Sequence, residues 1–183
     1  MIRAVVGTIA VLAGFAVLED SLDASAGSAA SCRDKQAYAL LQPGEALPVR
    51  NLPTPEGRVV GTFAAPNMGA NGTASPVTIV GSQSGWARIA LHGKDFTAID
   101  GMPQQFGWVP ADQLTVDTRV DGTITTFSRP GSLGGELGRI EGEDQKFQVL
   151  GCRGDWLQVI NASRGNVWID RWCAREEGCR SPS

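Results

Sequence analysis

The sequence has one histidine, one tyrosine and little net charge, and these shortages exclude several classes of protein. The formal charge is −3, and the Lys and Arg residues form no basic run that alternates with aromatics, which removes the electrostatic case for nucleic-acid binding. The sole histidine, His92, belongs to no nucleophile-activating arrangement, and no Gly-rich loop opens a helix to cradle phosphate. We therefore expect no catalytic residues, no enzyme activity and no cofactor.

Long apolar runs are absent except near the start of the chain. Residues 4–18 form an uncharged apolar run that follows Arg3 and precedes the small-residue motif Ala24-Ser25-Ala26. This layout is typical of a secretory signal peptide, and the run is short for a membrane span of roughly 20 residues. Acidic residues before the cleavage motif leave an uncleaved anchor or a buried helix as alternatives. We expect residues 1–26 to be removed and the mature protein to be soluble and extracytoplasmic, either periplasmic or secreted.

Four cysteines remain after that cleavage. An even number in an exported chain is typical of disulfides. Metal binding is the alternative, but the chain lacks C-x-x-C pairs and its histidine lies far away in sequence. Three connectivities are open, although Cys173 and Cys179 are near enough in sequence to close a short loop. We expect two disulfides and no metal, with the bridges formed among Cys32, Cys152, Cys173 and Cys179.

A degenerate internal repeat is the main feature that the sequence does contain. In both copies a proline is followed eight residues later by a glycine, and two tryptophan segments come after it. A repeat of this length predicts two small folded units. The first copy contains Pro53, Gly61, Gly85-Trp86 and Gly107-Trp108-Val109, and the second contains Pro130, Gly138, Asp155-Trp156 and Val167-Trp168-Ile169.

Apolar residues alternate with a period of two inside both copies. Ala87 and Ile89 share one face of the segment that begins at Trp86, and Leu157 and Val159 hold the same phase in the second copy. The 23 Gly and 10 Pro indicate many tight turns, and no stretch of the mature chain predicts an amphipathic helix. We expect an all-β protein whose short strands close into two small barrels, because closure removes exposed sheet edges.

These patterns divide the chain into segments. The first copy carries extra turn-rich material at residues 66–72 and 92–105, which we place in surface loops. The predicted segments are a signal peptide at 1–26, a polar lead-in at 27–42, a first domain at 43–117, a hinge at 118–122, a second domain at 123–175 and a tail at 176–183.

At the repeat positions the chain resembles the bacterial SH3 (SH3b, SH3-like) family, in tandem. The similarity covers about 130 residues. The second copy departs from the family pattern because it has Phe127 in place of an Arg, and Asn166-Val167 before Trp168 where Gly is expected. The resemblance implies two SH3-like barrels in a non-catalytic module that binds peptide or cell-wall-associated ligands. The motifs that carry it are Val49-Arg50, Gly85-Trp86, Gly107-Trp108-Val109, Gly154-Asp155-Trp156 and Trp168-Ile169.

The resemblance also implies a shallow groove beside the tryptophans at the strand starts. An exposed indole beside Arg88 or Gln158 offers apolar and hydrogen-bonding surface to a peptide. The alternative is that each Trp only covers a barrel end, and a structural role is favoured for Trp108 and Trp168. A second functional hypothesis is a structural or regulatory protein that contacts another exported protein through the loops of the first domain. The candidate groove residues are Trp86, Arg88, Trp108, Trp156 and Gln158.

Overall fold

The computed structural model describes residues 29–42, 44–64, 73–91, 96–99, 101, 104–141, 146–161, 165–175 and 178–179. Within these ranges the regular structure is β-strand apart from one turn of 3-10 helix, η1 (Ala111–Gln113), which confirms the all-β class. The predicted signal peptide at 1–26 lies outside the described residues, as does most of the predicted tail. In the part of the chain that is described, no helix has the length and apolar character needed to cross a membrane.

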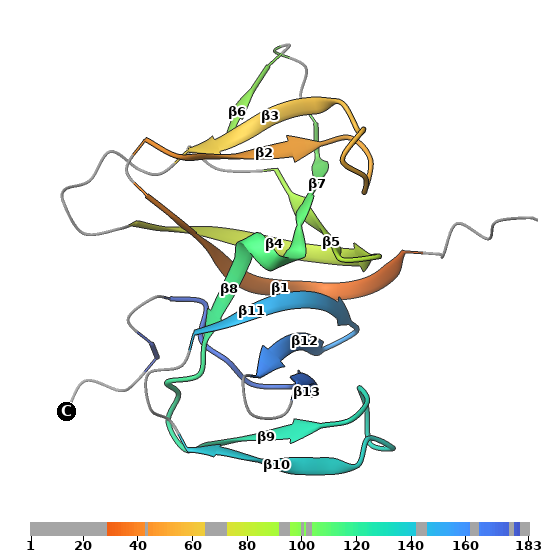
Figure 1. Cartoon of the computed structure of the whole chain (residues 1–183), viewed down its shortest axis with the longest axis vertical. Coiled ribbons are helices and arrows are strands. Elements are labelled where there is room, and N and C mark those ends of the chain that lie inside the picture. Colours follow the sequence, from red (N-terminus) through yellow and green to blue (C-terminus); the bar gives the residue numbers. More distant parts are fainter. Residues whose placement is uncertain are drawn as a thin grey trace, which may run out of the picture.

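All the strands join one antiparallel sheet, whose order is β10-β9-β13-β12-β11-β8-β1-β4-β5-β7-β2-β3-β6 (Figure 1). Their bounds are β1 (Ala30–Leu41), β2 (Ala46–Arg50), β3 (Val59–Ala64), β4 (Thr73–Gln83), β5 (Trp86–Ala90), β6 (Phe96–Ala98), β7 (Phe106–Pro110), β8 (Leu114–Asp117), β9 (Thr123–Phe127), β10 (Glu136–Glu141), β11 (Lys146–Arg153), β12 (Trp156–Asn161) and β13 (Gly165–Ile169).

The two copies of the sequence repeat have the same order of strands in the sheet. Counted outward from the middle of the sheet, β4-β5-β7-β2-β3 of the first copy corresponds to β11-β12-β13-β9-β10 of the second. Each copy has a register shift at the same place, after which Gly81 pairs with Arg88 in the first copy and Gly151 pairs with Gln158 in the second. The two copies therefore share their strand pairing down to an equivalent β-bulge.

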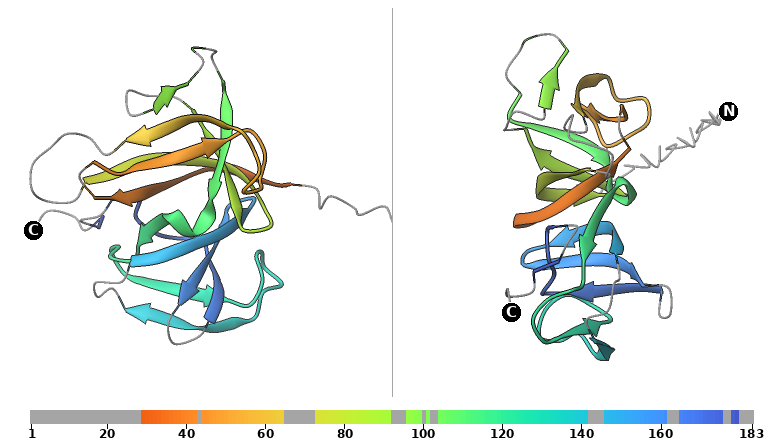
Figure 2. Two further views of the ribbon diagram at one scale, coloured as in Figure 1. Left: turned by 45° about the horizontal axis from the view of Figure 1, so that its top comes forward. Right: turned by 90° about the vertical axis from the view of Figure 1, so that its left-hand side faces the viewer.

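The closed barrels expected from the sequence are not present in the pairing pattern. Among the described residues, β10 and β6 stand at the two ends of the sheet order, and no pairing joins them. Strand β8 pairs with β1 on one side and with β11 on the other, so the two copies are fused through their edges. Figure 2 shows the two halves of the molecule meeting along β1, β8 and β11.

Strand β1 occupies the segment that the sequence assigns to a polar lead-in. It pairs with β4 over nearly its whole length and with β8 near its end, and Ala37, Tyr38 and Ala39 are fully buried. The sequence predicts a polar lead-in at 27–42, but even the polar residues Lys35 and Gln36 lie within paired strand. The segment is therefore the first strand of the first copy.

Strand β8 plays the corresponding part in the second copy. In the first copy β1 pairs with β4 and with β8. In the second copy β8 pairs with β11, and its residue Asp117 forms a bridge with Cys173. The bridge consists of two backbone hydrogen bonds between Asp117 and Cys173, with N···O distances of 2.9 and 2.7 Å. One strand thus ends the first copy and begins the second, directly before the predicted hinge at 118–122.

The core is one continuous cluster that spans both copies. It contains the inward-facing residues of the equivalent strands, among them Ile79 and Ile89 in the first copy and Val149 and Leu157 in the second, all fully buried. Burial of each such side chain stabilises the fold by about 1.5–3 kcal/mol.

Two disulfides link the four cysteines, which confirms the expectation of two bridges. Cys32 of β1 is bonded to Cys152 of β11, 120 positions apart, and Cys173 is bonded to Cys179. The described residues include no free cysteine. Structural disulfides persist in oxidising compartments, so the bridges indicate an extracytoplasmic environment.

Candidate functional site

The predicted alternation places the candidate residues on the outer face of each copy. Ala87 and Ile89 of β5 are fully buried, whereas Trp86 is half-buried and Arg88 is exposed. The second copy follows the same phase, because Leu157 and Val159 of β12 are buried. Trp156 and Gln158 consequently project from the opposite side, both half-buried.

On the first copy, both arginines of the outer face are engaged within the protein. Trp108 of β7 pairs with Arg88 on one side and with Arg50 of β2 on the other. The Arg88 guanidinium lies 4.5 Å from the centre of the Phe106 ring, and Arg50 Nη1 donates a 2.7 Å hydrogen bond to the carbonyl of Gly57. These contacts direct both cations toward the protein's own groups.

On the second copy, an aromatic cluster replaces the arginines. Phe127 of β9 takes the register position of Arg50 and pairs with Trp168 of β13, which in turn pairs with Gln158. Phe127 and Trp156 meet edge to face, with ring centres 5.0 Å apart and planes at 90°. In the sequence Phe127 is a departure from a family pattern, and the structure shows that it packs on Trp156 from the register position of Arg50.

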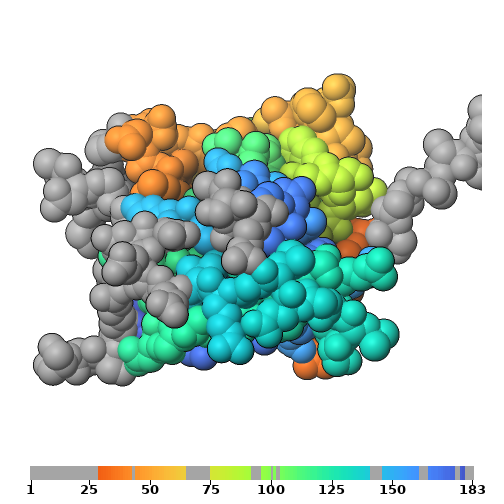
Figure 3. All heavy atoms as spheres, turned by 60° about the horizontal axis from the view of Figure 1, so that its bottom comes forward, coloured from red at the N-terminus to blue at the C-terminus, as the bar shows by residue number. Residues whose placement is uncertain are grey.

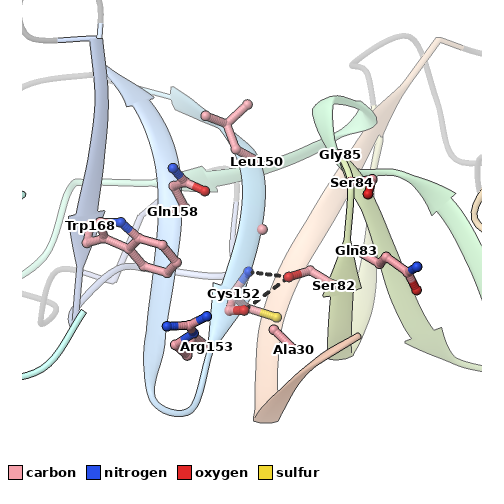
Figure 4. A pocket seen from close by; sticks show the side chains of 11 residues that line it. Ala30, Ser82, Gln83, Ser84, Gly85, Leu150, Cys152, Arg153, Gln158 and Trp168 are labelled. Atoms are coloured by element: carbon pink, nitrogen blue, oxygen red, sulfur yellow. Dashed lines mark hydrogen bonds between the residues drawn. The ribbon is translucent and has the colours of Figure 1, made fainter. Parts of the chain in front are cut away.

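A first cavity, of about 450 Å³, lies where the two copies meet (Figure 4). We call it the inter-copy cavity. The Ser82 hydroxyl fixes one wall, since it accepts a 3.0 Å hydrogen bond from the Cys152 amide and donates one of 3.0 Å to the Cys152 carbonyl. Its lining residues are Ala30, Ser82, Gln83, Ser84, Gly85, Leu150, Gly151, Cys152, Arg153, Gln158 and Trp168.

A second cavity, of about 440 Å³, lies against the loop that connects β9 to β10. We call it the loop cavity. Arg153 lines both cavities, so they adjoin at this residue. Figure 3 shows β9 and β10 with their connecting loop, in cyan, standing out on the surface at this end of the molecule. The loop cavity is lined by Arg129, Pro130, Gly131, Leu133, Arg153 and Trp156.

The charge around the loop cavity is positive. Among the described residues no acidic side chain lines it, and the side chains of Arg129 and Arg153 form no ion pair or hydrogen bond there. The nearest acid in sequence, Asp155, is neutralised by Arg33 and Lys35 at N···O distances of 2.9 Å each. The hydrogen bond from Lys35 holds the pKa of Asp155 below its ordinary value.

The structure brings some of the predicted site residues together and separates others. Trp156 lines the loop cavity and Gln158 the inter-copy cavity. Trp86, Arg88 and Trp108 belong to the other copy and line neither. Residues 65–72 and 92–95, which hold most of the predicted contact loops and His92, lie outside the described residues. Over the described ranges no group of three or more His, Cys, Asp and Glu side chains could hold a metal ion.

A further hollow of about 460 Å³ lies beside the C-terminal disulfide. Its wall is formed by Val120, Asp121, Asp170, Arg171, Trp172 and Cys179, none of which belongs to the predicted groove. The Arg171 guanidinium donates a 2.6 Å hydrogen bond to the Asp121 carbonyl. This cation is therefore already bound to the protein backbone.

The sequence matches no known protein family and no curated protein. Among solved structures, the chain is similar to NlpC2 from Trichomonas vaginalis, with 15% sequence identity and a TM-score of 0.30. The match covers 76% of this chain and 48% of the other, so the chain spans about half the length of that protein. We base no inference on a likeness of this size.

Proposed function

We propose that this protein is a non-catalytic exported binding module built from two tandem SH3-like units, and that it recognises peptide segments through the outer face of the second copy. The peptide belongs either to a cell-wall polymer or to another exported protein. The repeated strand order supports the tandem arrangement, with β8 shared between the two units. The two disulfides support export.

The observation that carries this proposal is the pair of cavities that adjoin at Arg153. Together they extend from the loop after β9 to the turn between β4 and β5. The indoles of Trp156 and Trp168 supply apolar surface, and the Gln158 amide supplies a donor and an acceptor. Ligand sites are usually concave and combine apolar surface with a few placed polar groups, and two adjoining hollows suit an extended peptide.

The second copy is favoured as the binding site because the arginine side chains that line its loop cavity, unlike those on the outer face of the first copy, are not bound to other groups of the described residues. Arg88 and Arg50 of the first copy contact Phe106 and Gly57, as described above, whereas Arg129 and Arg153 of the second copy are free to meet a ligand. The alternative function, a protein contact through the loops of the first copy, depends largely on residues 66–72 and 92–95, which lie outside the described ranges.

The proposal is tested by retention on purified peptidoglycan, on the same material after amidase removal of its stem peptides, and on immobilised peptides. The double variant Trp156→Ala/Gln158→Ala is compared with its register equivalent in the first copy, Trp86→Ala/Arg88→Ala. We expect retention on at least one peptide-bearing matrix, none on the stripped glycan, and a loss of about tenfold or more in the second-copy variant alone.

A cooperative urea-unfolding transition should show that both double variants are folded. Equal retention of the two variants would contradict the assignment to the second copy. Failure of the wild-type protein to bind any peptide-bearing matrix would refute the function itself.

A further inference from the structure

We infer that the loop cavity is an acid-recognising subsite, which takes a carboxylate of the bound peptide between Arg129 and Arg153 while an adjacent apolar side chain packs on Trp156 and Leu133. This inference rests on the proposed function and specifies the class of peptide that the second copy prefers.

The electrostatic part comes from the two arginines. Both line the same cavity, and among the described residues neither side chain has an ion-pair or hydrogen-bond partner and no acidic residue lines the cavity. A guanidinium offers parallel N–H donors that match the two oxygens of a carboxylate, which makes arginine the preferred partner for that group.

The apolar part comes from the loop and from β12. Leu133 is 95% exposed, and it lines the cavity together with Trp156 and Pro130. An exposed leucine at the rim of a cavity gains stabilisation when a ligand covers it. The ligand that satisfies both parts is a peptide in which an acidic residue neighbours an apolar one.

The loop is held in a fixed shape, so the subsite is formed before the ligand arrives. The Ser128 amide donates a 2.9 Å hydrogen bond to the Gly135 carbonyl, and the Gly134 amide donates one of 3.0 Å to the Gly131 carbonyl. A Cβ at Gly134 would lie 2.2 Å from the Arg129 carbonyl oxygen, so only glycine permits this turn. A preformed loop reduces the entropy lost on binding.

The first copy supplies an internal comparison. Its loop at 51–58 has the same length and the same two hydrogen bonds, from Asn51 to Arg58 at 3.0 Å and from Gly57 to Thr54 at 3.1 Å. In this alignment Arg129 corresponds to Leu52, and Leu133 corresponds to Glu56.

The second arginine is equally specific to the second copy. Arg153 pairs with Trp156, and Gln83 pairs with Trp86 at the equivalent register position. The backbone is thus repeated but both cations are absent from the first copy, so the arginine pair belongs to the second copy alone.

The experiment measures fluorescence anisotropy of a labelled hexapeptide, Glu-Leu-Glu-Leu-Glu-Leu, and of its amide counterpart, Gln-Leu-Gln-Leu-Gln-Leu. The test variant, Arg129→Leu/Arg153→Gln, carries the residues of the first copy. The control Arg175→Gln removes an exposed charge that lines neither cavity. We expect the wild-type protein and the control to bind the acidic peptide about tenfold more tightly than the amide peptide, with an affinity that falls as salt is added.

In the test variant the preference should fall to about twofold or less, while binding of the amide peptide is unchanged. Equal binding of both peptides by the wild-type protein would overturn the subsite and leave the proposed function in place. An acid preference that survives in the test variant would also overturn it, since the preference would then arise elsewhere. Absence of binding to either peptide would contradict the inference as well.

Discussion

The two copies reach the same backbone with different side chains, and this is clearest at the residue before the second tryptophan. A Cβ at Gly107 would lie 2.2 Å from Val49 Cγ1, so the first copy needs glycine there. The second copy has Val167 at this position and Thr126 in place of Val49, both fully buried. The larger residue before Trp168 is thus accompanied by a second change, in which Thr126, a side chain of nearly the same volume, stands in place of Val49.

Gly107→Ala should destabilise the protein because the added methyl overlaps a fully buried valine. Overpacking of this kind costs about 1–3 kcal/mol, measured as a lower midpoint in urea unfolding. Gly135→Ala is the control, since a Cβ there meets only the Ser128 hydroxyl at 3.5 Å. An unchanged midpoint for Gly107→Ala would contradict the required close approach.

The charge of a single residue, Asp155, should make the stability of the protein depend on pH. The pKa of Asp155 is held below its ordinary value of 3.8 by the hydrogen bond from Lys35. A carboxylate with a lowered folded-state pKa contributes stability above its unfolded pKa and loses it as the pH falls through the folded value.

Asp155→Asn should therefore be less stable than the wild-type protein at pH 5–7, and the difference should begin to shrink near pH 3.8 and vanish below the folded-state pKa. Lys35→Gln, which removes the donor, should behave in the same way in thermal melts across this range. A stability difference that grows toward low pH would have the wrong sign.

At the scale of the element, the two disulfides constrain the chain to different degrees. The Cys32–Cys152 bond ties β1 to β11 across 120 positions, whereas Cys173–Cys179 closes a loop with a separation of 6. Loop-closure entropy grows with the length of the loop, so the first bond restricts the unfolded chain more strongly.

Cys32→Ala/Cys152→Ala should accordingly cost about 5 kcal/mol, and Cys173→Ala/Cys179→Ala about 2 kcal/mol. Urea unfolding of the two double variants under oxidising conditions measures the difference. The reverse order would show that native contacts, and not chain entropy, dominate the contribution of these bonds.

The whole molecule should unfold as a single unit, because the copies share β8 and one continuous core. Ile89→Ala in the first copy and Leu157→Ala in the second both remove fully buried side chains, and each should cost about 2–5 kcal/mol. Both variants should shift one common transition, observed identically by tryptophan fluorescence and far-UV circular dichroism. Two separated transitions in either variant would show that the copies fold independently.

Local patterns were sufficient to predict some features of the fold. The alternation of Trp86, Ala87 and Arg88 fixed which face of β5 is buried, because successive side chains of a strand point to opposite sides. The even number of cysteines similarly predicted two bridges without their connectivity. Strand β1 could not be recognised, since its polar residues 33–36 are held by partners distant in sequence, among them β4 and Asp155.

By itself, the sequence determined the all-β class, the repeat and the outward face of Trp156 and Gln158, because each depends on residues close together in the chain. Only the tertiary structure decided that β8 serves both copies and that Arg129 and Arg153 line one cavity. Both features bring together segments that are distant in sequence. They depend on long-range strand pairing, which a local alternation of apolar residues does not encode.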